Sequence, residues 1–319
     1  MTVLFNSGRP LYRCENLTAV WDAYDGDKTF KQGGYADLIK YGNDNYKIVV
    51  TDEFIKTKAP DQKIIMIGHG LNGGKLYGID QPRGMFNPKS CKLTDYYIAS
   101  SEYGRQFAAS AAGIDIEKCP ALGMPRTDNY IGKHKGDGHT ILSYYKRAYL
   151  YLPTFRAKYN ERTPLINYEY LNSLLEEDEI FVVKRHMITK NKILPKTLTN
   201  IYEVDNTKPT APYLFDCDVF ITDFSSALFD AYFLNKPSVL VADENDKYLI
   251  SRGMYMDYPY DYGSRTIAVK NNEEKFVELL RDAYNKGMTD IEYECRRKTS
   301  DACDGHSAER VVQLIKELS

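Results

Sequence analysis

Short apolar runs alternate with stretches of helical periodicity along most of the chain, and this alternation is typical of parallel α/β units. In the first half, the expected strands are Thr2–Phe5, Lys47–Thr51, Lys63–Ile67 and Tyr96–Ala99. The stretch Ser101–Ala112 predicts a helix, with Ser100 or Ser101 as its N-cap and Gly113 as its end.

A polar segment with three glycines in eight residues runs from Gly132 to His139, and we place the domain boundary there. The predicted N-terminal domain covers residues 1–133, and the C-terminal domain covers residues 140–319. The second half restarts the pattern with strands near Ala148–Leu152, Ile180–Lys184, Val219–Thr222 and Ser238–Val241, and helices near Leu165–Leu175, Ala227–Leu234, Glu273–Asn285 and Ala308–Leu318. The last helix has an apolar face, so we expect it to pack on another element, with the first domain as one candidate. Two doubly wound domains that face each other across a cleft are the simplest architecture.

Length and composition narrow the class of protein. The 319 residues suit two domains, and 42 basic against 44 acidic residues give a net charge of −2, so nucleic acid is not an expected partner. No apolar run approaches the roughly 18 residues of a membrane span, and the first residues lack a secretory signal. We therefore expect a cytoplasmic protein with at most weak peripheral contact with the inner face of the cell membrane.

The six scattered cysteines are predicted to be free thiols.

Ligands of open α/β sheets bind beyond the carboxyl ends of the strands, close to helix N-termini. The clearest strand end is Asp218–Ser226, which brings Thr222, Asp223, Ser225 and Ser226 to the tip of a buried strand before the next helix begins. The free N–H groups of that helix and the two seryl hydroxyls could bind a phosphate. The alternative is that one serine only caps the helix.

A second strand end carries a histidine. His69 lies between Gly68 and Gly70, directly after the strand Lys63–Ile67. Glycine weakens both helix and strand, so this histidine is not expected to be a packed core residue. An imidazole with a near-neutral pKa suits a general base, and a hydrogen bond that only stabilises a turn is the alternative.

Three further strand ends carry cations and hydroxyls: Phe181–His186, Tyr151–Arg156 and Gly123–Asp128. Together, the clusters suit a diphosphate without a P-loop motif. The acidic pair of Asp216 and Asp218 matches a metal-binding DxD pattern, but it precedes its strand, so we expect it at the opposite edge of the sheet and predict no metal. Of the remaining histidines, His134 and His139 are expected in solvent, and His306 near the start of the last helix.

At these residues the sequence resembles the CDP-glycerol glycerophosphotransferase family of teichoic acid primases and polymerases. The family's motifs occur in order as Gly68-His-Gly70, Gly123-Met-Pro-Arg-Thr-Asp128, Leu152-Pro-Thr-Phe-Arg156, Lys184-Arg-His186, Thr222-Asp-Phe-Ser-Ser226 with Phe229-Asp230, Gly253-Met-Tyr-Met-Asp-Tyr258 and Asp304-Gly-His-Ser-Ala-Glu-Arg310. The match covers roughly residues 60–319. Ile67 and Gly68 stand where the family has Thr-Trp, and Leu71–Lys75 replaces Thr-Pro-Leu-Lys, so the identity of the polyol stays open.

The resemblance implies a GT-B fold of two Rossmann-like domains with parallel sheets, the acceptor domain first and the CDP-binding domain second. It implies that His69 is the catalytic base. The residues that it implies for donor binding are Gly70, Arg126, Pro153, Thr154, Arg185, His186, Ser225, Ser226 and Asp230.

The predicted reaction is an in-line displacement without a metal or other cofactor. An acceptor hydroxyl on a polymer or a lipid-linked molecule, deprotonated by His69, attacks the β-phosphorus of a CDP-polyol such as CDP-glycerol, and CMP leaves.

Two alternatives remain open at this point. One is a nucleotide-sugar glycosyltransferase or epimerase of the same fold, and the other is a non-catalytic glycan-binding protein.

Overall fold

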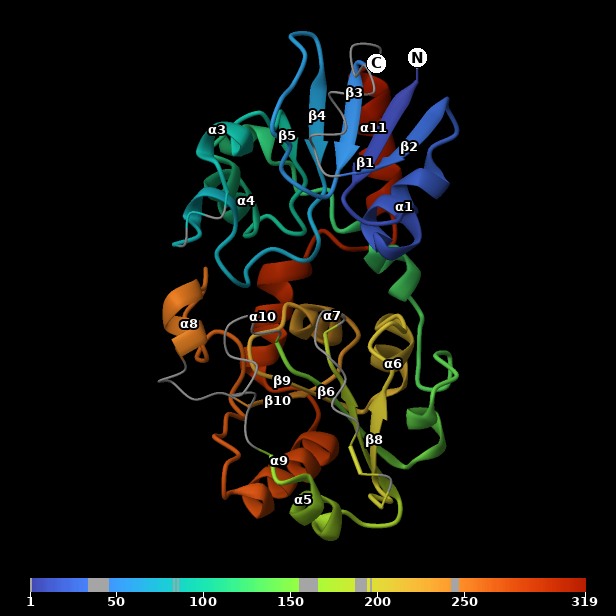
Figure 1. The fold of residues 1–319 in the computed structure, drawn as a ribbon, viewed down its shortest axis with the longest axis vertical. Helices are drawn as coiled ribbons and strands as arrows, with labels where there is room; N and C mark the ends of the chain where they lie inside the picture. The colour runs from blue at the N-terminus through green and yellow to red at the C-terminus, as the bar shows by residue number, and fades with distance from the viewer. Residues whose placement is uncertain are drawn as a thin grey trace. The chain divides into compact units, whose positions relative to one another are not determined.

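The computed structural model describes residues 2–33, 46–82, 84, 86–154, 166–186, 194–195, 197–241 and 247–319. They form two compact units, each built on a five-stranded parallel sheet (Figure 1). Unit 1 consists of Met1–Ile131, Ser251–Tyr255 and Arg297–Ser319, and unit 2 of Gly132–Ile250 and Met256–Arg296. The polar segment that begins at Gly132 therefore opens unit 2. Residues 251–255 and 297–319, which the sequence assigns to the second domain, group with unit 1.

The sheet of unit 1 has the strand order β2-β1-β3-β4-β5. Its strands are β1 (Val3–Ser7), β2 (Lys28–Gln32), β3 (Ile48–Thr51), β4 (Lys63–Met66) and β5 (Tyr96–Tyr97). The four strands expected in this half are confirmed to within about two residues at each end. Strand β2 was not predicted, because it is a half-exposed edge strand whose sequence Lys-Thr-Phe-Lys-Gln has no apolar run.

The helices of unit 1 include α1 (Glu15–Ala23), α3 (Pro88–Cys91), α4 (Arg105–Ala112) and α11 (Ser307–Glu317). Helix α11 buries Val311, Val312 and Ile315 and packs against α1 and the 3₁₀ segment Pro125–Tyr130 (Figure 1). The predicted apolar face of the last helix is thus confirmed, with His306 at its N-cap.

The predicted start of helix α4 was wrong by four residues. The helix begins at Arg105, and its N-cap is Gly104. The Ser101 hydroxyl accepts the N–H of Gly104 in a turn before the helix and donates to the carbonyl of Lys298. The hydroxyl of Ser100 accepts the N–H of Asn72. Neither serine is therefore the N-cap, because both hydroxyls serve a turn or another segment. The predicted end at Gly113, in the left-handed conformation, is confirmed.

The sheet of unit 2 has the strand order β10-β9-β6-β7-β8. Its strands are β6 (Arg147–Leu152), β7 (Glu179–Lys184), β8 (Ile201–Val204), β9 (Val219–Thr222) and β10 (Ser238–Leu240). Its helices are α5 (Tyr168–Leu174), α6 (Ala211–Asp216), α7 (Ala227–Phe233) and α9 (Glu273–Lys286), while α8 (Lys247–Arg252) and α10 (Asp290–Ser300) each include residues of both units. The four strands and three helices expected here are confirmed, with small differences at their ends. Residue 165, the expected first residue of the helix that became α5, lies outside the described residues.

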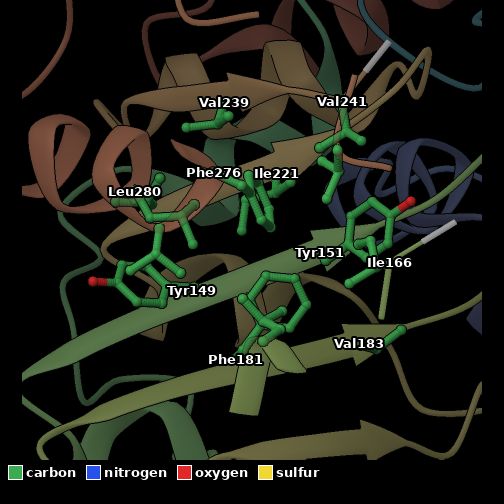
Figure 2. Packing of buried hydrophobic residues seen from close by; sticks show 14 of the residues in the cluster. Tyr149, Tyr151, Ile166, Phe181, Val183, Ile221, Val239, Val241, Phe276 and Leu280 are labelled. Atoms are coloured by element: carbon green, nitrogen blue, oxygen red, sulfur yellow. The ribbon is translucent and has the colours of Figure 1, made fainter. Parts of the chain in front are cut away.

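The core of unit 2 forms between its sheet and helix α9. Figure 2 shows Tyr151 of β6, Phe181 of β7 and Ile221 of β9 in one apolar cluster with Phe276 of α9. The buried strands carry apolar residues on both faces, as expected for a parallel sheet that is covered on both sides. All six cysteines are buried and free, which confirms that prediction. None of the helices in the described ranges has both the length and the hydrophobicity that a membrane span requires.

Candidate active site

Three neighbouring strands of unit 1 bring charged side chains to one edge of the sheet. Strands β1, β3 and β4 are adjacent and parallel, so their carboxyl ends lie at the same edge. Arg9 follows β1, Asp52 follows β3 and His69 follows β4. The three side chains meet at this edge, and they form the cluster that we call the His69 site.

The ring of His69 is partly exposed and contacts charged groups through both nitrogens. Its Nδ1 lies 2.7 Å from Nη2 of Arg9 and 3.3 Å from Oδ2 of Asp52. Its Nε2 lies 3.9 Å from Oε1 of Glu53. As the flanking glycines predicted, the ring does not pack in the core, since 38% of its side-chain surface is exposed.

Asp52 is the buried member of the His69 site, with only 2% of its side chain exposed. Burial alone raises the pKa of this carboxyl group, but its neighbours His69 and Arg9 outweigh burial and lower the pKa below its usual value. Oδ2 of Asp52 accepts a hydrogen bond from Nη2 of Arg9 at 2.7 Å. Asp52 is therefore ionised near neutral pH, and it places a fixed negative charge beside the ring.

The backbone around His69 is held by side chains from two other segments. Gly68 has φ +77°, a conformation that favours glycine. Its carbonyl accepts a hydrogen bond from Nδ2 of Asn16 at 3.1 Å, and Oδ1 of Asn16 accepts the N–H of Arg126 at 3.1 Å. The buried guanidinium of Arg126 donates to the carbonyl of His69. Arg126 thus fixes the loop that carries His69 and Gly70, and its predicted contact with a donor phosphate stays a prediction.

In unit 2, the adjacent strands β6 and β9 bring Thr154 and Asp223 together. Oδ1 of Asp223 accepts the N–H of Thr154 at 2.8 Å and the N–H of Phe224 at 2.6 Å. The hydroxyl of Thr154 is buried, and it has no hydrogen-bond partner in the described part of the chain. A buried hydroxyl without a partner next to Pro153 is well suited to bind a ligand oxygen.

The loop between β9 and α7 carries Ser225 and Ser226. The hydroxyl of Ser225 accepts the N–H of Ala227 at 3.3 Å, so this serine does help to cap α7. Ser226 stands at the N-cap, is exposed and makes no capping hydrogen bond with its side chain. Asp230, one turn further on, is 4% exposed and is therefore not the solvated surface residue that an exposed helix face would carry.

The end of β7 carries Arg185 and His186. Arg185 is buried, and its Nε donates to Oε1 of Glu203 on β8 at 2.7 Å. Burial lowers the pKa of this guanidinium, but Tyr168 and Glu203 raise the pKa by more than burial lowers it, so the net shift is upward. His186 is exposed. Arg156, which the sequence places after β6, lies outside the described residues.

The two carboxylates of the DxD pattern form hydrogen bonds and an ion pair with other residues of unit 2. The carboxylate of Asp216 accepts the N–H groups of Gly136, Gly138 and Thr140 and the hydroxyl of Thr140, at distances of 2.7–3.0 Å. Asp218 pairs with Nζ of Lys135 and accepts the N–H of Ala148. Both carboxylates therefore organise the segment before β6. No group of three or more potential metal ligands occurs among the residues that the structure describes.

Sequence reasoning missed Arg9 and Asp52, which belong to the His69 site, and Asn16, which bonds to the backbone beside it. Asp52 comes directly after a predicted strand, so the rule that located His69 could also have located Asp52. Arg9 lies further from the end of the predicted strand Thr2–Phe5. Asn16 follows no strand, and no local pattern indicates its role. The predicted exposure of His134 and His139 is confirmed, and so is the predicted place of His306 at the start of the last helix.

Two motifs of the suspected family contact each other in unit 1. The carboxylate of Asp128 accepts the N–H groups of Ser307 and Ala308, at 3.0 and 2.7 Å, and so caps helix α11. Arg310 donates to the carbonyls of Leu122 and Ala302. These motif residues thus hold the last helix against the rest of unit 1.

Residues 41–317 match the family described as CDP-glycerol:poly(glycerophosphate) glycerophosphotransferase. This chain belongs to that family. Among curated family members, it is 28% identical over 294 residues to a teichoic acid poly(ribitol-phosphate) polymerase of Bacillus spizizenii, with 84% of this chain and 46% of the relative covered. It is 26% identical over 295 residues to a teichoic acid glycerol-phosphate primase of Bacillus subtilis, with 86% and 74% covered. The chain thus spans about half to three quarters of the length of these relatives.

Solved structures identify the fold of this glycerophosphotransferase family member as GT-B. The wall teichoic acid polymerase TagF matches with a TM-score of 0.76 and 19% identity, covering 99% of this chain and 88% of that one. A UDP-GlcNAc 2-epimerase of Neisseria meningitidis matches less well, with a TM-score of 0.61 and 11% identity, and 99% and 100% covered. The expected GT-B type of two Rossmann-like units with parallel sheets is confirmed.

Proposed function

We propose that this chain transfers a glycerol-phosphate or related polyol-phosphate unit from a CDP-polyol to an acceptor hydroxyl and releases CMP. The observation that carries the proposal is the His69 site, a partly exposed histidine between two glycines whose ring contacts a buried carboxylate. The segment Gly68-His69-Gly70 resembles the family's histidine motif, and the chain matches the family over residues 41–317.

In the proposed reaction, His69 is the general base. The acceptor hydroxyl gives its proton to Nε2, because Nδ1 is already in contact with Arg9 and Asp52. The hydroxyl oxygen forms a bond to the β-phosphorus while the bond from that phosphorus to the oxygen of CMP breaks. CMP leaves with the electron pair of that bond, so the step needs no oxidant or further reactant.

The donor is proposed to bind through groups at strand ends, most of which belong to unit 2. Phosphate oxygens would accept from the hydroxyls of Thr154 and Ser226 and from the first N–H groups of helix α7. The other residues proposed for the donor are Gly70, Arg126, Pro153, Arg185, His186, Ser225 and Asp230. Because Arg185 is paired with Glu203, its guanidinium would bind phosphate through the nitrogens that Glu203 leaves available.

We also propose that the reaction needs no divalent metal. Support comes from Asp216 and Asp218, whose carboxylates are bound to backbone N–H groups, a hydroxyl and Lys135. The cationic and N–H groups of the chain would then stabilise the diphosphate charge.

For the acceptor we propose the growing polymer or a lipid-linked primer. The names of the relatives, a polymerase and a primase, support an acceptor that belongs to polymer synthesis. Contact with the membrane would be weak, because the near-neutral net charge of −2 gives little attraction to anionic lipids. Sedimentation with anionic vesicles at low and physiological salt measures this contact. Tight, salt-resistant sedimentation would contradict it.

The central experiment measures release of CMP from CDP-glycerol and CDP-ribitol, each with a lipid-linked primer and with a soluble polyol-phosphate acceptor. UDP-GlcNAc serves as the donor control in every reaction. We expect CMP only from a CDP-polyol and only when an acceptor is present. Turnover of UDP-GlcNAc, or binding of CDP-polyols without any CMP release under all conditions, would refute the proposal.

A further inference from the structure

Nδ1 of His69 has two charged neighbours that require opposite protonation states of the ring. The guanidinium of Arg9 can only donate a hydrogen bond, and the carboxylate of Asp52 can only accept one. Nη2 of Arg9 lies 2.7 Å from Nδ1, whereas Oδ2 of Asp52 lies 3.3 Å away. The shorter contact makes Nδ1 an acceptor, and in a neutral imidazole the hydrogen is then on Nε2.

The environment of Nε2 agrees with this tautomer. Oε1 of Glu53 lies 3.9 Å from Nε2, so a hydrogen on this nitrogen points into the field of a carboxylate. An Nε2 that carries a hydrogen cannot accept a proton from an acceptor hydroxyl. The arrangement in this structure therefore holds His69 in a form that is inactive as a base through Nε2.

Asp52 is placed to produce the active form. Its side chain is 2% exposed, and its Oδ1 is buried without a hydrogen-bond partner in the described residues. The carboxylate thus has capacity to accept a hydrogen bond from Nδ1 in addition to that from Arg9. An Nδ1–H donated to Asp52 would leave the lone pair of Nε2 free, as a general base requires.

A ligand can reach Arg9 as well as the ring of His69. The side chain of Arg9 is 37% exposed, and Arg9 follows β1 at the edge of the sheet where ligands of such folds bind. A guanidinium matches two phosphate oxygens, and such charge-assisted hydrogen bonds are stronger than one to a neutral imidazole.

We propose that a phosphate group of a substrate draws Arg9 away from His69, that Nδ1 then donates to Asp52, and that His69 becomes a base only in this state. The ring keeps one hydrogen throughout, since Nε2 releases a proton to solvent and Nδ1 takes one up. Arg9 and Asp52 are thus positioning residues that act through His69. The inference rests on the proposed function only for the identity of the phosphate, which belongs to the donor or to the acceptor.

The test is nitrogen NMR of the full chain with ¹⁵N-labelled histidine rings, which shows which ring nitrogen carries the hydrogen. The His69→Gln variant assigns the His69 signals. We expect the hydrogen on Nε2 in the free protein and on Nδ1 after addition of CDP or glycerol 3-phosphate. CDP represents the donor, glycerol 3-phosphate represents the acceptor, and potassium chloride at equal ionic strength should change nothing.

Variants separate the roles of the two neighbours. Arg9→Met should place the hydrogen on Nδ1 even without ligand, whereas Arg13→Met, which removes a nearby exposed charge, should leave the free state unchanged. In Asp52→Asn, phosphate ligands should no longer move the hydrogen. With active substrates, Arg9→Met should raise KM about 10-fold or more with kcat largely retained, and Asp52→Asn should lower kcat about 10²–10⁴-fold with KM retained.

Two results would overturn the proposal: a hydrogen on Nδ1 in the free wild-type protein, or a hydrogen that stays on Nε2 with both phosphate ligands. The NMR experiment requires no turnover. If CMP is never released but CDP still moves the hydrogen, the proposed function fails and this inference stands. If turnover occurs and the hydrogen does not move, the reverse holds.

Discussion

One carboxylate oxygen of Asp223 accepts the backbone N–H of Thr154 at 2.8 Å and thereby joins the carboxyl ends of strands β6 and β9. The same oxygen accepts the N–H of Phe224. Replacing Asp223 by alanine leaves both buried N–H groups without this acceptor, and each loss costs about 1–3 kcal/mol of the free energy of unfolding. Asp223→Asn keeps an oxygen acceptor and should cost less.

Urea unfolding of both Asp223 variants measures these changes. The control is Glu177→Ala, an exposed carboxylate of the same unit, which should change the free energy of unfolding by less than about 0.5 kcal/mol. An equal loss in the asparagine and alanine variants would show that the negative charge matters rather than the hydrogen bonds.

Removal of the proposed base should slow the reaction without weakening donor binding. We expect His69→Ala to lower kcat about 10²–10⁴-fold while the Kd of CDP stays within a few-fold of wild type. The matched control is His134→Ala, which removes an exposed histidine from the other unit. Turnover of His69→Ala within a few-fold of wild type would show that another group takes the proton.

The phosphate site that we propose at the start of α7 can be tested by its effect on donor affinity. Changing both Ser225 and Ser226 to alanine removes two hydroxyls, and CDP and CDP-glycerol should both bind more weakly by about 1–3 kcal/mol. Isothermal titration calorimetry measures the change. Ser173→Ala, which removes an exposed hydroxyl on α5, is the control. If the double variant binds CDP like wild type, the phosphate does not bind at this strand end.

Asp216 offers a test that separates a structural carboxylate from a metal ligand. It accepts four hydrogen bonds from residues 136–140, and a Cβ at Gly138 would lie 2.7 Å from its Oδ2, so the segment fits closely around it. Asp216→Ala should lower the free energy of unfolding by about 3 kcal/mol or more, with the activity per folded molecule retained. Activity should also persist in excess EDTA. Activity that EDTA abolishes and Mg²⁺ or Mn²⁺ restores would contradict the metal-free reaction.

Glu179 predicts a pH dependence of stability. This buried carboxylate bonds to Arg281, Tyr149 and the N–H of Glu176. Burial raises the pKa of Glu179, but the hydrogen bond from Arg281 and the other donors outweigh burial and lower it. A lowered pKa means that its contribution to stability is complete above the pKa of the unfolded chain, and is lost as the pH falls through the pKa of the folded state.

The free energy of unfolding of wild type should therefore exceed that of Glu179→Gln by the largest amount at neutral pH. The difference should shrink as the pH falls below about 4. Urea unfolding from pH 7 to pH 3 measures it, with the exposed Glu177→Gln as control. A difference that grows toward acid would show that the pKa of Glu179 is raised in the folded protein.

The buried strands could be predicted because their sequences contain little else than apolar residues. Val219–Thr222 was predicted at its true bounds, since all four residues are buried and a polar loop follows. Strands β2 and β8 were missed because they lie at sheet edges, and half or more of their side chains reach solvent. The start of α4 was misplaced because serine is a common N-cap residue. Only the fold shows that the hydroxyls of Ser100 and Ser101 form hydrogen bonds with the backbone of Asn72 and Lys298 instead.

The candidate site was also predicted only in part from the sequence. His69 could be found because it follows a buried strand and has a glycine on each side, and this pattern is local in the sequence. The contacts of His69 with Arg9 and Asp52 could not be found from such a pattern, since these residues are 60 and 17 positions away and meet it only through the order of the strands. Their contact depends on which strands are neighbours, and that information is not local in the chain.

The division of the chain between the units has a consequence for biosynthesis. Unit 1 includes residues 297–319, whose helix α11 is capped by Asp128 and packs on α1. On a translating ribosome, α1 and the first sheet emerge before unit 2, but the helix that packs on α1 emerges after unit 2. Unit 2, whose residues end at Arg296, can complete its folding before the N-terminal unit does. We expect the reverse of the usual order, in which the N-terminal domain folds first, because the apolar surface of α1 stays uncovered until residues 297–319 have been made.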